Sequence, residues 1–361
     1  MKLIYTFLIL CCYLLSSAHA QRISMNDHWK FAKGDIDVSM LSQQAVWTNI
    51  TLPHTWNGYD GQDGGDDYYR GTGWYMRAFS LDKNDRSKCI YLRFGAANYL
   101  TEVYLNGGLI GTHSGGYTAF AFDITPFVRY DMSNQLLVKV SNADGLPVPP
   151  LSADFTFFGG LIRGVELIKK NKLHITAEDY GSNGVYVRQD KVSDKEAILS
   201  FTAKVRNTEK NAQKAVISFL IKERDGKVLK ETKEEKMILS KTTMPITSTF
   251  RIGNPHLWNG KKDPYLYTAE VKVKVGSEIA DNYTFPLGIR YYSIDPDRGF
   301  ILNGRSYPLR GVSLHEERKD KGNAVSDTER KEDIDRIVAM GSNYIRLSHY
   351  QHGDFTYRYL D

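Results

Sequence analysis

The sequence predicts a multidomain protein in which two β-sandwiches precede the start of a (β/α)8 TIM barrel. Three observations support this. Residues 21–170 hold many strand-like runs and turn signals, with no helix-period stretch of useful length. Residues 171–288 have the same character. Near the C-terminus a strand, a helix and a strand follow one another, which is the repeating unit of a parallel sheet.

The first 20 residues have the layout of a secretory signal peptide. Lys2 supplies the positive start, residues 3–15 form an apolar run, and Ala18-His19-Ala20 ends in a small-residue cleavage pattern. We therefore expect residues 1–20 to be removed, with the mature chain starting at Gln21 and exported to the periplasm or the extracellular space. A membrane anchor is the alternative, but the apolar run is too short to span a bilayer.

The chain has three cysteines, at positions 11, 12 and 89. Cys11 and Cys12 raise a lipoprotein signal as a second alternative, but Leu10 is bulky where that signal has a small residue. Only Cys89 remains after cleavage, so no intrachain disulfide is expected. Core size must then supply the stability of this exported chain.

Composition narrows the classes of partner. The formal net charge of +5 is mild for 361 residues, and no basic run with interleaved aromatics is present, so nucleic acid is not an expected partner. Aromatic residues make up 12% of the chain, which suits sugar stacking and equally suits β-sandwich cores. No pair of histidines or carboxylates has a metal-ligand spacing that stands alone, so no metal site is expected.

The first domain, residues 21–170, is predicted to be antiparallel. Residues 74–79, 90–94 and 136–140 are enriched in aromatic and β-branched residues, as strands are. Residues 103–105 lead straight into Asn106-Gly107, a strong hairpin signal. These features favour a sandwich or jelly roll.

The same region carries a family resemblance. Residues 70–75 (RGTGWY), 104–125 and 157–165 (FFGGLIRGV) resemble, in order, the signatures of the sugar-binding domain of glycoside hydrolase family 2. The resemblance rests on all three segments occurring in the family's order rather than on any one of them. The resemblance implies a jelly-roll sugar-binding domain here.

The second domain, residues 171–288, is a further β unit. Residues 199–205 and 215–221 are strand-like, and Asp225-Gly226 marks a hairpin turn into Val228. Residues 254–258, 263–267 and 287–290 are similar to the closing pattern of the immunoglobulin-like sandwich of the same family. The resemblance therefore covers this unit too.

The third region, residues 289–361, is expected to begin a barrel. Residues 300–304 form one more hairpin, and residues 307–312 are predicted as the first barrel strand. Residues 326–329 (SDTE) form a capping box, apolar residues follow at helical spacing, and Gly341 stands where a left-handed cap belongs. Residues 344–347 are the second strand.

Polar side chains follow both strands, and the active site of a βα barrel is built at the carboxyl ends of its strands. The resemblance implies that His315 and His349 hydrogen-bond sugar hydroxyls or stabilise the transition state. It also implies that Arg346 stiffens the site and holds a neighbouring carboxylate. Asp154 is a further substrate-binding candidate, because an aspartate of the jelly roll reaches the sugar in related β-galactosidases. The alternative is a barrel-end network that touches no sugar. Glu316 is expected to be exposed and to orient a neighbour.

A retaining glycosidase needs two carboxyl groups, one as acid/base and one as nucleophile. The resemblance implies that these glutamates follow the fourth and seventh barrel strands. Residues 289–361 are too few for a barrel of about 250 residues, so both glutamates are expected beyond Asp361 and no residue of this chain is assigned as catalytic. We expect the chain alone to be inactive. No cofactor is identifiable, although some relatives use Mg or Na ions whose ligands would lie mainly downstream.

These observations favour the N-terminal part of an exported retaining exo-β-glycosidase that acts on a carbohydrate substrate. Within the family, His349-Tyr350 after Arg346 fits the β-galactosidase and β-glucuronidase branches better than the β-mannosidase branch, and we favour a β-galactosidase. A non-catalytic carbohydrate-binding protein that uses the jelly roll alone is the alternative from another class. A homo-oligomer stays open.

Overall fold

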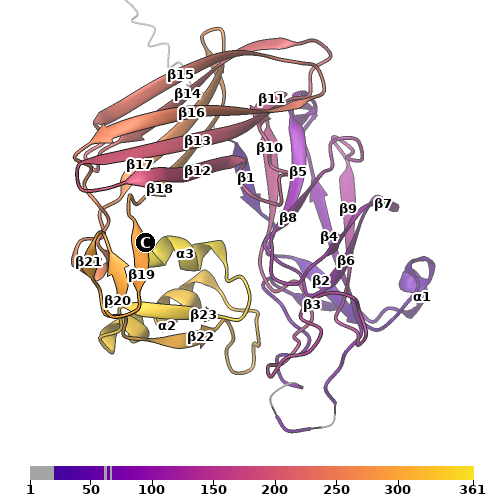
Figure 1. The fold of residues 1–361 in the computed structure, drawn as a ribbon. Helices are drawn as coiled ribbons and strands as arrows, with labels where there is room; N and C mark the ends of the chain where they lie inside the picture. Colours follow the sequence, from indigo (N-terminus) through magenta and orange to yellow (C-terminus); the bar gives the residue numbers. More distant parts are fainter. Residues whose placement is uncertain (1–19, 61–62, 66) are drawn as a thin grey trace, which may run out of the picture.

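The structure is a computed structural model that describes residues 20–60, 63–65 and 67–361. The expected signal peptide therefore lies, apart from Ala20, outside the described residues. The first strand, β1, begins at Gln21. Figure 1 shows two β-sandwiches set at an angle, with the C-terminal unit below the second sandwich and beside the first.

The first unit is a jelly roll of two antiparallel sheets. The larger sheet has the order β3-β2-β4-β9-β6-β7 and the smaller has the order β1-β10-β5-β8. The larger sheet contains β2 (Trp29–Lys33), β3 (Thr48–Ile50), β4 (Thr72–Ser80), β6 (Leu100–Leu105), β7 (Gly108–Ser114) and β9 (Ser133–Ser141). The smaller contains β1 (Gln21–Ser24), β5 (Cys89–Phe94), β8 (Phe120–Asp123) and β10 (Val165–Lys170). The short helices of this unit are η1 (Val38–Met40), α1 (Leu41–Gln44) and η2 (Lys83–Ser87).

The core of the jelly roll lies between these two sheets. Trp29, Tyr75, Phe94 and Val138 are fully buried there and belong to one apolar cluster. The predicted hairpin is confirmed: β6 pairs with β7 across Asn106-Gly107, and both turn residues have positive φ. That geometry suits Asn-Gly because glycine has no Cβ to clash and asparagine tolerates the left-handed region.

The second unit is an immunoglobulin-like sandwich. In one sheet β13 (Glu196–Asn207) pairs with β11 (Leu173–Ile175), β12 (Val185–Val192) and β16 (Thr243–Gly253). The other sheet has the order β15-β14-β17-β18, with β14 (Gln213–Lys222), β15 (Val228–Ile238), β17 (Tyr267–Val275) and β18 (Glu278–Leu287). The residues of β13 alternate strictly between buried and partly exposed, which is the pattern of a strand with one face on a core.

The third unit contains the predicted parallel pair. The short helix η3 (Gly260–Lys262) lies between β16 and β17 of the sandwich. After the sandwich comes a small sheet of β19 (Tyr292–Asp295), β20 (Gly299–Leu302) and β21 (Arg305–Ser306). Then come β22 (Gly311–His315), α2 (Asp327–Ala339), β23 (Tyr344–Ser348) and α3 (Asp354–Leu360). The capping box at Ser326 and Glu329 is confirmed, as is the left-handed Gly341 with φ +89°.

The first barrel strand is displaced from its predicted position. Residues 307–312 were expected, whereas β22 spans Gly311–His315 and pairs in parallel with β23. Pro308 has no N–H to give to a ladder, and the Arg310 amide donates instead to the Asn343 side chain at 2.7 Å. His315 is therefore the last residue of the strand and lies opposite Ser348.

Candidate functional site

The two predicted histidines meet at the carboxyl ends of β22 and β23. In the parallel register His315 lies opposite Ser348, so His349 follows directly beyond the same edge. The two imidazole rings stand edge to face, with centroids 5.1 Å apart. His315 is partly exposed and His349 is exposed, so this pair can be reached by a ligand.

An aromatic residue of the jelly roll completes this cluster. The ring of Phe155 lies 5.5 Å from that of His315, 6.3 Å from that of His349 and 5.6 Å from that of Tyr350. A second jelly-roll ring, Tyr117, stacks on Tyr350 at 3.9 Å. Sequence reasoning did not select Phe155; its only signal was its position beside Asp154.

The remaining predicted residues stand at the margin of the cluster. Asp154 directly precedes Phe155, so the structure brings it to the same place, and its side chain is exposed. Arg346 lies on β23 opposite Ser313 and is also exposed. Within the described part of the chain, no carboxylate forms an ion pair with Arg346. The carboxylate-holding role of Arg346 and the sugar contact of Asp154 stay predictions.

Glu316 was expected to be exposed, and that expectation is wrong. The side chain is 4% exposed. Its Oε1 accepts hydrogen bonds from Arg163 Nε at 3.1 Å and from Arg330 Nη2 at 2.7 Å, and its Oε2 accepts one from the Gly353 amide at 2.7 Å. Sequence alone could not show this, because Arg163 lies 153 residues away.

The electrostatics of Glu316 follow from these partners. Burial by itself would raise the pKa of this carboxyl, but the charges of Arg163 and Arg330 outweigh burial and hold the pKa below its usual range. A carboxylate that stays ionised, with both oxygens occupied, is not a proton donor and is not free to attack a sugar. Glu316 is therefore unsuited to be the acid/base or the nucleophile of a glycosidase.

His352 is a second buried group that sequence reasoning missed. Its Nε2 donates to the carbonyl of Ser348 at 3.2 Å, and its Nδ1 lies 3.7 Å from Glu316 Oε2. Burial lowers the pKa of this imidazole, although the Glu316 charge acts in the opposite direction. His352 is thus held at the end of β23, with its Nδ1 facing the buried carboxylate of Glu316.

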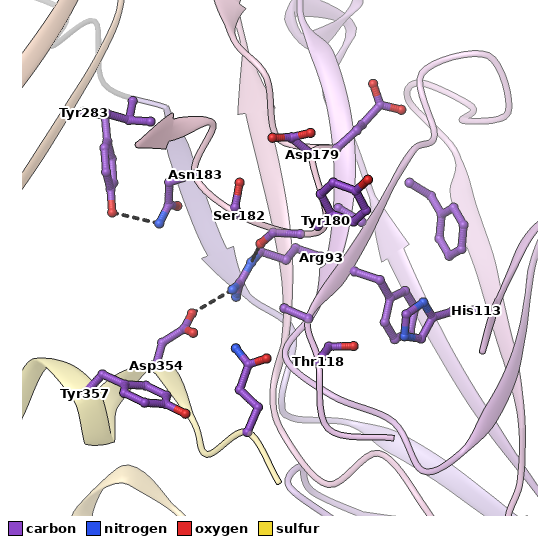
Figure 2. Close-up of a pocket in the computed structure, with 18 of the residues that line it drawn as sticks. Arg93, His113, Thr118, Asp179, Tyr180, Ser182, Asn183, Tyr283, Asp354 and Tyr357 are labelled. Atoms are coloured by element: carbon purple, nitrogen blue, oxygen red, sulfur yellow. Dashed lines mark hydrogen bonds and ion pairs between the residues drawn. The ribbon is translucent and has the colours of Figure 1, made fainter. Parts of the chain in front are cut away.

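A cavity of about 860 Å³ lies where the three units meet. Figure 2 shows Arg93 of the jelly roll meeting Asp354 of α3, while Asn183 donates to the Tyr283 hydroxyl across the other side of the cavity. None of the four predicted substrate-binding residues lines it. Gln351 does, and its carbonyl accepts a hydrogen bond from Arg163 at 2.6 Å. This cavity is therefore adjacent to the Glu316 network but separate from the histidine pair.

The described residues contain neither a cluster of metal-ligating side chains nor a membrane-spanning helix. Among residues 20–60, 63–65 and 67–361, no group of three or more His, Cys, Asp or Glu side chains is placed to hold a metal ion. In the same part of the chain, no helix has both the length and the apolar character needed to cross a membrane.

Family models match the chain in three consecutive blocks. The sugar-binding domain of glycosyl hydrolases family 2 matches residues 16–171, a second family 2 domain matches residues 181–290, and the family 2 TIM barrel domain matches residues 296–361. The order is the one that the sequence signatures predicted.

Individual relatives agree with these matches. A β-glucuronidase of Bacteroides fragilis is 37% identical over 99% of this chain and 50% of its own length. The β-galactosidase BoGH2A of Bacteroides ovatus is 31% identical over 91% of this chain and 38% of its own length. The solved structure of Bacteroides uniformis β-glucuronidase 2, covalently bound to cyclophellitol-6-carboxylate aziridine, has a TM-score of 0.89 at 35% identity, over 94% of this chain and 40% of that one.

The chain thus spans about half the length, or less, of these relatives. They include both β-glucuronidases and β-galactosidases, so the comparisons do not specifically favour the β-galactosidase expected from the sequence. The three family models name one family and follow one another along the chain. The chain belongs to glycoside hydrolase family 2.

Proposed function

We propose that this chain forms the sugar-binding end of a retaining exo-β-glycosidase. The observation that carries the proposal is the His315–His349 pair, which stands with Phe155 at the carboxyl ends of two parallel barrel strands. Barrel enzymes place their substrates at this end of the strands. Ring nitrogens and an aromatic face suit a sugar, because hydroxyls need hydrogen-bond partners and the sugar's C–H face packs on aromatic rings.

The acid/base and nucleophile are proposed to come from barrel residues after Asp361 in the whole protein. Glu316 cannot serve, since its oxygens are held by two arginines and an amide. Retaining enzymes need two carboxyl groups about 5 Å apart, on opposite sides of the scissile bond. The part of the protein proposed here supplies binding and positioning rather than the bond-breaking groups.

The substrate is proposed to be a terminal β-linked glucuronide or galactoside. The glucuronide is supported by the 37% identity to the β-glucuronidase of B. fragilis. The galactoside is supported by the 31% identity to BoGH2A. Both sugars share the equatorial β-linkage, but they differ in the configuration at C4 and in the uronate carboxylate. A cationic partner in later barrel loops would favour the glucuronide.

The test is hydrolysis of aryl β-glucuronide and aryl β-galactoside. Residues 21–361 should be silent, while a longer version that carries the rest of the open reading frame should turn over one of the two substrates. In that longer protein, His315→Phe or His349→Phe should lower kcat/KM by about 100-fold or more, as the loss of a hydrogen bond to developing charge does. Near-normal kinetics in both variants would remove the histidines from the site. Turnover by residues 21–361 alone would contradict the proposal that the bond-breaking carboxyl groups lie after Asp361.

We also propose export through a secretory pathway. The N-terminal pattern supports it, and so does the start of β1 at Gln21, which pairs with Lys169 of β10. A mature chain that begins at Gln21 would keep this strand complete. N-terminal sequencing of secreted protein should read Gln21-Arg22-Ile23, and a cytoplasmic protein that still begins at Met1 would contradict the proposal.

A further inference from the structure

The guanidinium of Arg163 is shared among three segments of the chain. Its Nε donates to Glu316 at 3.1 Å, its Nη1 donates to the carbonyl of Tyr117 at 2.6 Å, and its Nη2 donates to the carbonyl of Gln351 at 2.6 Å. Arg163 and Tyr117 belong to the jelly roll, whereas Glu316 and Gln351 follow the two barrel strands. One side chain of the jelly roll therefore fixes both strand-end loops.

Glu316 closes this arrangement from the barrel side. It directly follows His315, and its Oε2 holds the amide of Gly353, four residues after His349. The backbone of Glu316 takes part as well, since its carbonyl accepts from Asn323 Nδ2 at 2.8 Å, and the same amide donates to the Tyr350 hydroxyl at 3.1 Å. Both histidine-bearing loops are thus tied to one carboxylate.

We propose that Glu316 and Arg163 are positioning residues that set the relative geometry of the His315–His349 pair. The jelly roll is then an integral part of the barrel's sugar site rather than an appended binding module. This inference rests on the proposed function for its catalytic consequence, but its structural part can be tested without any glycosidase activity.

Stability alone does not account for the network. Burying charges costs free energy, and well-packed apolar residues commonly replace a buried ion pair without loss of stability. Charge-assisted hydrogen bonds instead fix direction, and the planar guanidinium imposes a fixed fork on its partners. Arg163 and Glu316 together make five hydrogen bonds, one of which is the 3.1 Å bond between them. These bonds fix the positions of the two loops that follow β22 and β23. That is the requirement for holding two catalytic-site rings at a set distance.

A second ion pair between the jelly roll and the barrel start provides a control for the effect of weakening the contact between these two units. Arg93 of the jelly roll donates to Asp354 of α3 at 2.7 Å, so this pair bridges the same two units (Figure 2). The Asp354 side chain is 52% exposed, against 4% for Glu316. Asp354→Asn weakens docking while leaving the Arg163–Glu316 network intact.

The test uses histidine Hε1 signals in NMR spectra of the chain, assigned with single His→Gln variants. The two rings lie close to each other and to Phe155, so their chemical shifts report ring geometry. Glu316→Gln places an amide group where each hydrogen-bond partner of the carboxylate is a donor, and neither orientation of that amide satisfies all three of them. We expect the His315 and His349 signals to move in Glu316→Gln and to stay in Asp354→Asn. Unmoved signals in a folded Glu316→Gln chain, or equal movement in Asp354→Asn, would overturn the proposal.

A second variant covers failure of Glu316→Gln to fold. Arg163→Lys keeps the positive charge but cannot reach three acceptors, so it should move the same two signals; if it folds with both unmoved, the proposal fails. In the longer protein, either variant should lower kcat by about 100-fold with KM little changed, as a misplacement of about 1 Å does. Asp354→Asn should keep kcat. Moved signals together with an inactive longer protein would reject the proposed function and leave the positioning role standing.

Discussion

The buried ion pair between Lys170 and Asp281 joins the jelly roll to the second sandwich, and it gives the sharpest stability prediction. Asp281 is 1% exposed and Lys170 is 9% exposed. Asp281 accepts from Lys170 Nζ at 2.8 Å, from the amide of Ile175 at 2.9 Å and from the amide of Asn282 at 3.0 Å. Asp281→Asn removes the charge and leaves the buried ammonium without its counter-ion.

The expected cost follows from that geometry. Removing one partner of a buried pair destabilises by about 3–5 kcal/mol, because the other charge stays desolvated. The other hydrogen bond of the Lys170 ammonium within the described part of the chain goes to the uncharged carbonyl of Ile175 at 2.8 Å, which does not neutralise it. The double variant Lys170→Met/Asp281→Leu removes both charges, so it should recover most of the loss.

The assay is urea unfolding of residues 21–361, monitored by circular dichroism. The free energy of the transition in which the sandwich unfolds is compared between the unchanged chain, the single variant and the double variant. Asp335→Asn is the control, because Lys331 and Asp335 pair with side chains 51% and 49% exposed, and such pairs contribute less than about 1 kcal/mol. A loss below about 1 kcal/mol in Asp281→Asn, or a double variant as unstable as the single, would refute the reasoning.

Three further predictions concern the barrel start. Ser326→Ala removes the N-cap of α2, whose hydroxyl accepts from the Glu329 amide at 3.3 Å, and should cost about 1 kcal/mol in urea unfolding; no change would show that tertiary packing alone holds the helix. Gly311→Ala should disrupt the β22–β23 pair, since the added Cβ would lie 1.8 Å from the carbonyl oxygen of Tyr344, whereas Gly253→Ala meets nothing within 4 Å and should be tolerated; equal melting temperatures would contradict this. Because the folded pKa of Glu316 is depressed, its stabilisation is present above pH about 4.5 and is lost as the pH falls through the folded pKa. Acidification should therefore destabilise the native chain more than Glu316→Gln, which urea midpoints at neutral and acid pH would measure.

Local features of the fold were predictable because their causes are local. The hairpins at residues 106–107 and 225–226 depend on turn residues that tolerate positive φ, and the capping box depends on two residues three positions apart. The sequence predicted that two parallel strands form here, but it did not predict where the first one begins. Pro308 and the pairing of Gly311 with Tyr344 decide the start of β22. His315 and His349 were placed together correctly because parallel strands end at one edge.

Local sequence was enough to predict the strand periodicity, the turns, the helix cap and the family signatures, because each depends on residues close together in the chain. Domain packing, in contrast, buries Glu316, brings Phe155 to the histidine pair and lets Arg163 join the jelly roll to both strand ends. Each of these contacts brings together residues more than 150 positions apart. Hydrophobic periodicity reports which face of an element is buried, but not which distant charge lies against it. A carboxylate that reads as a solvated surface group in sequence thus becomes an ion-paired core group once the domains pack together.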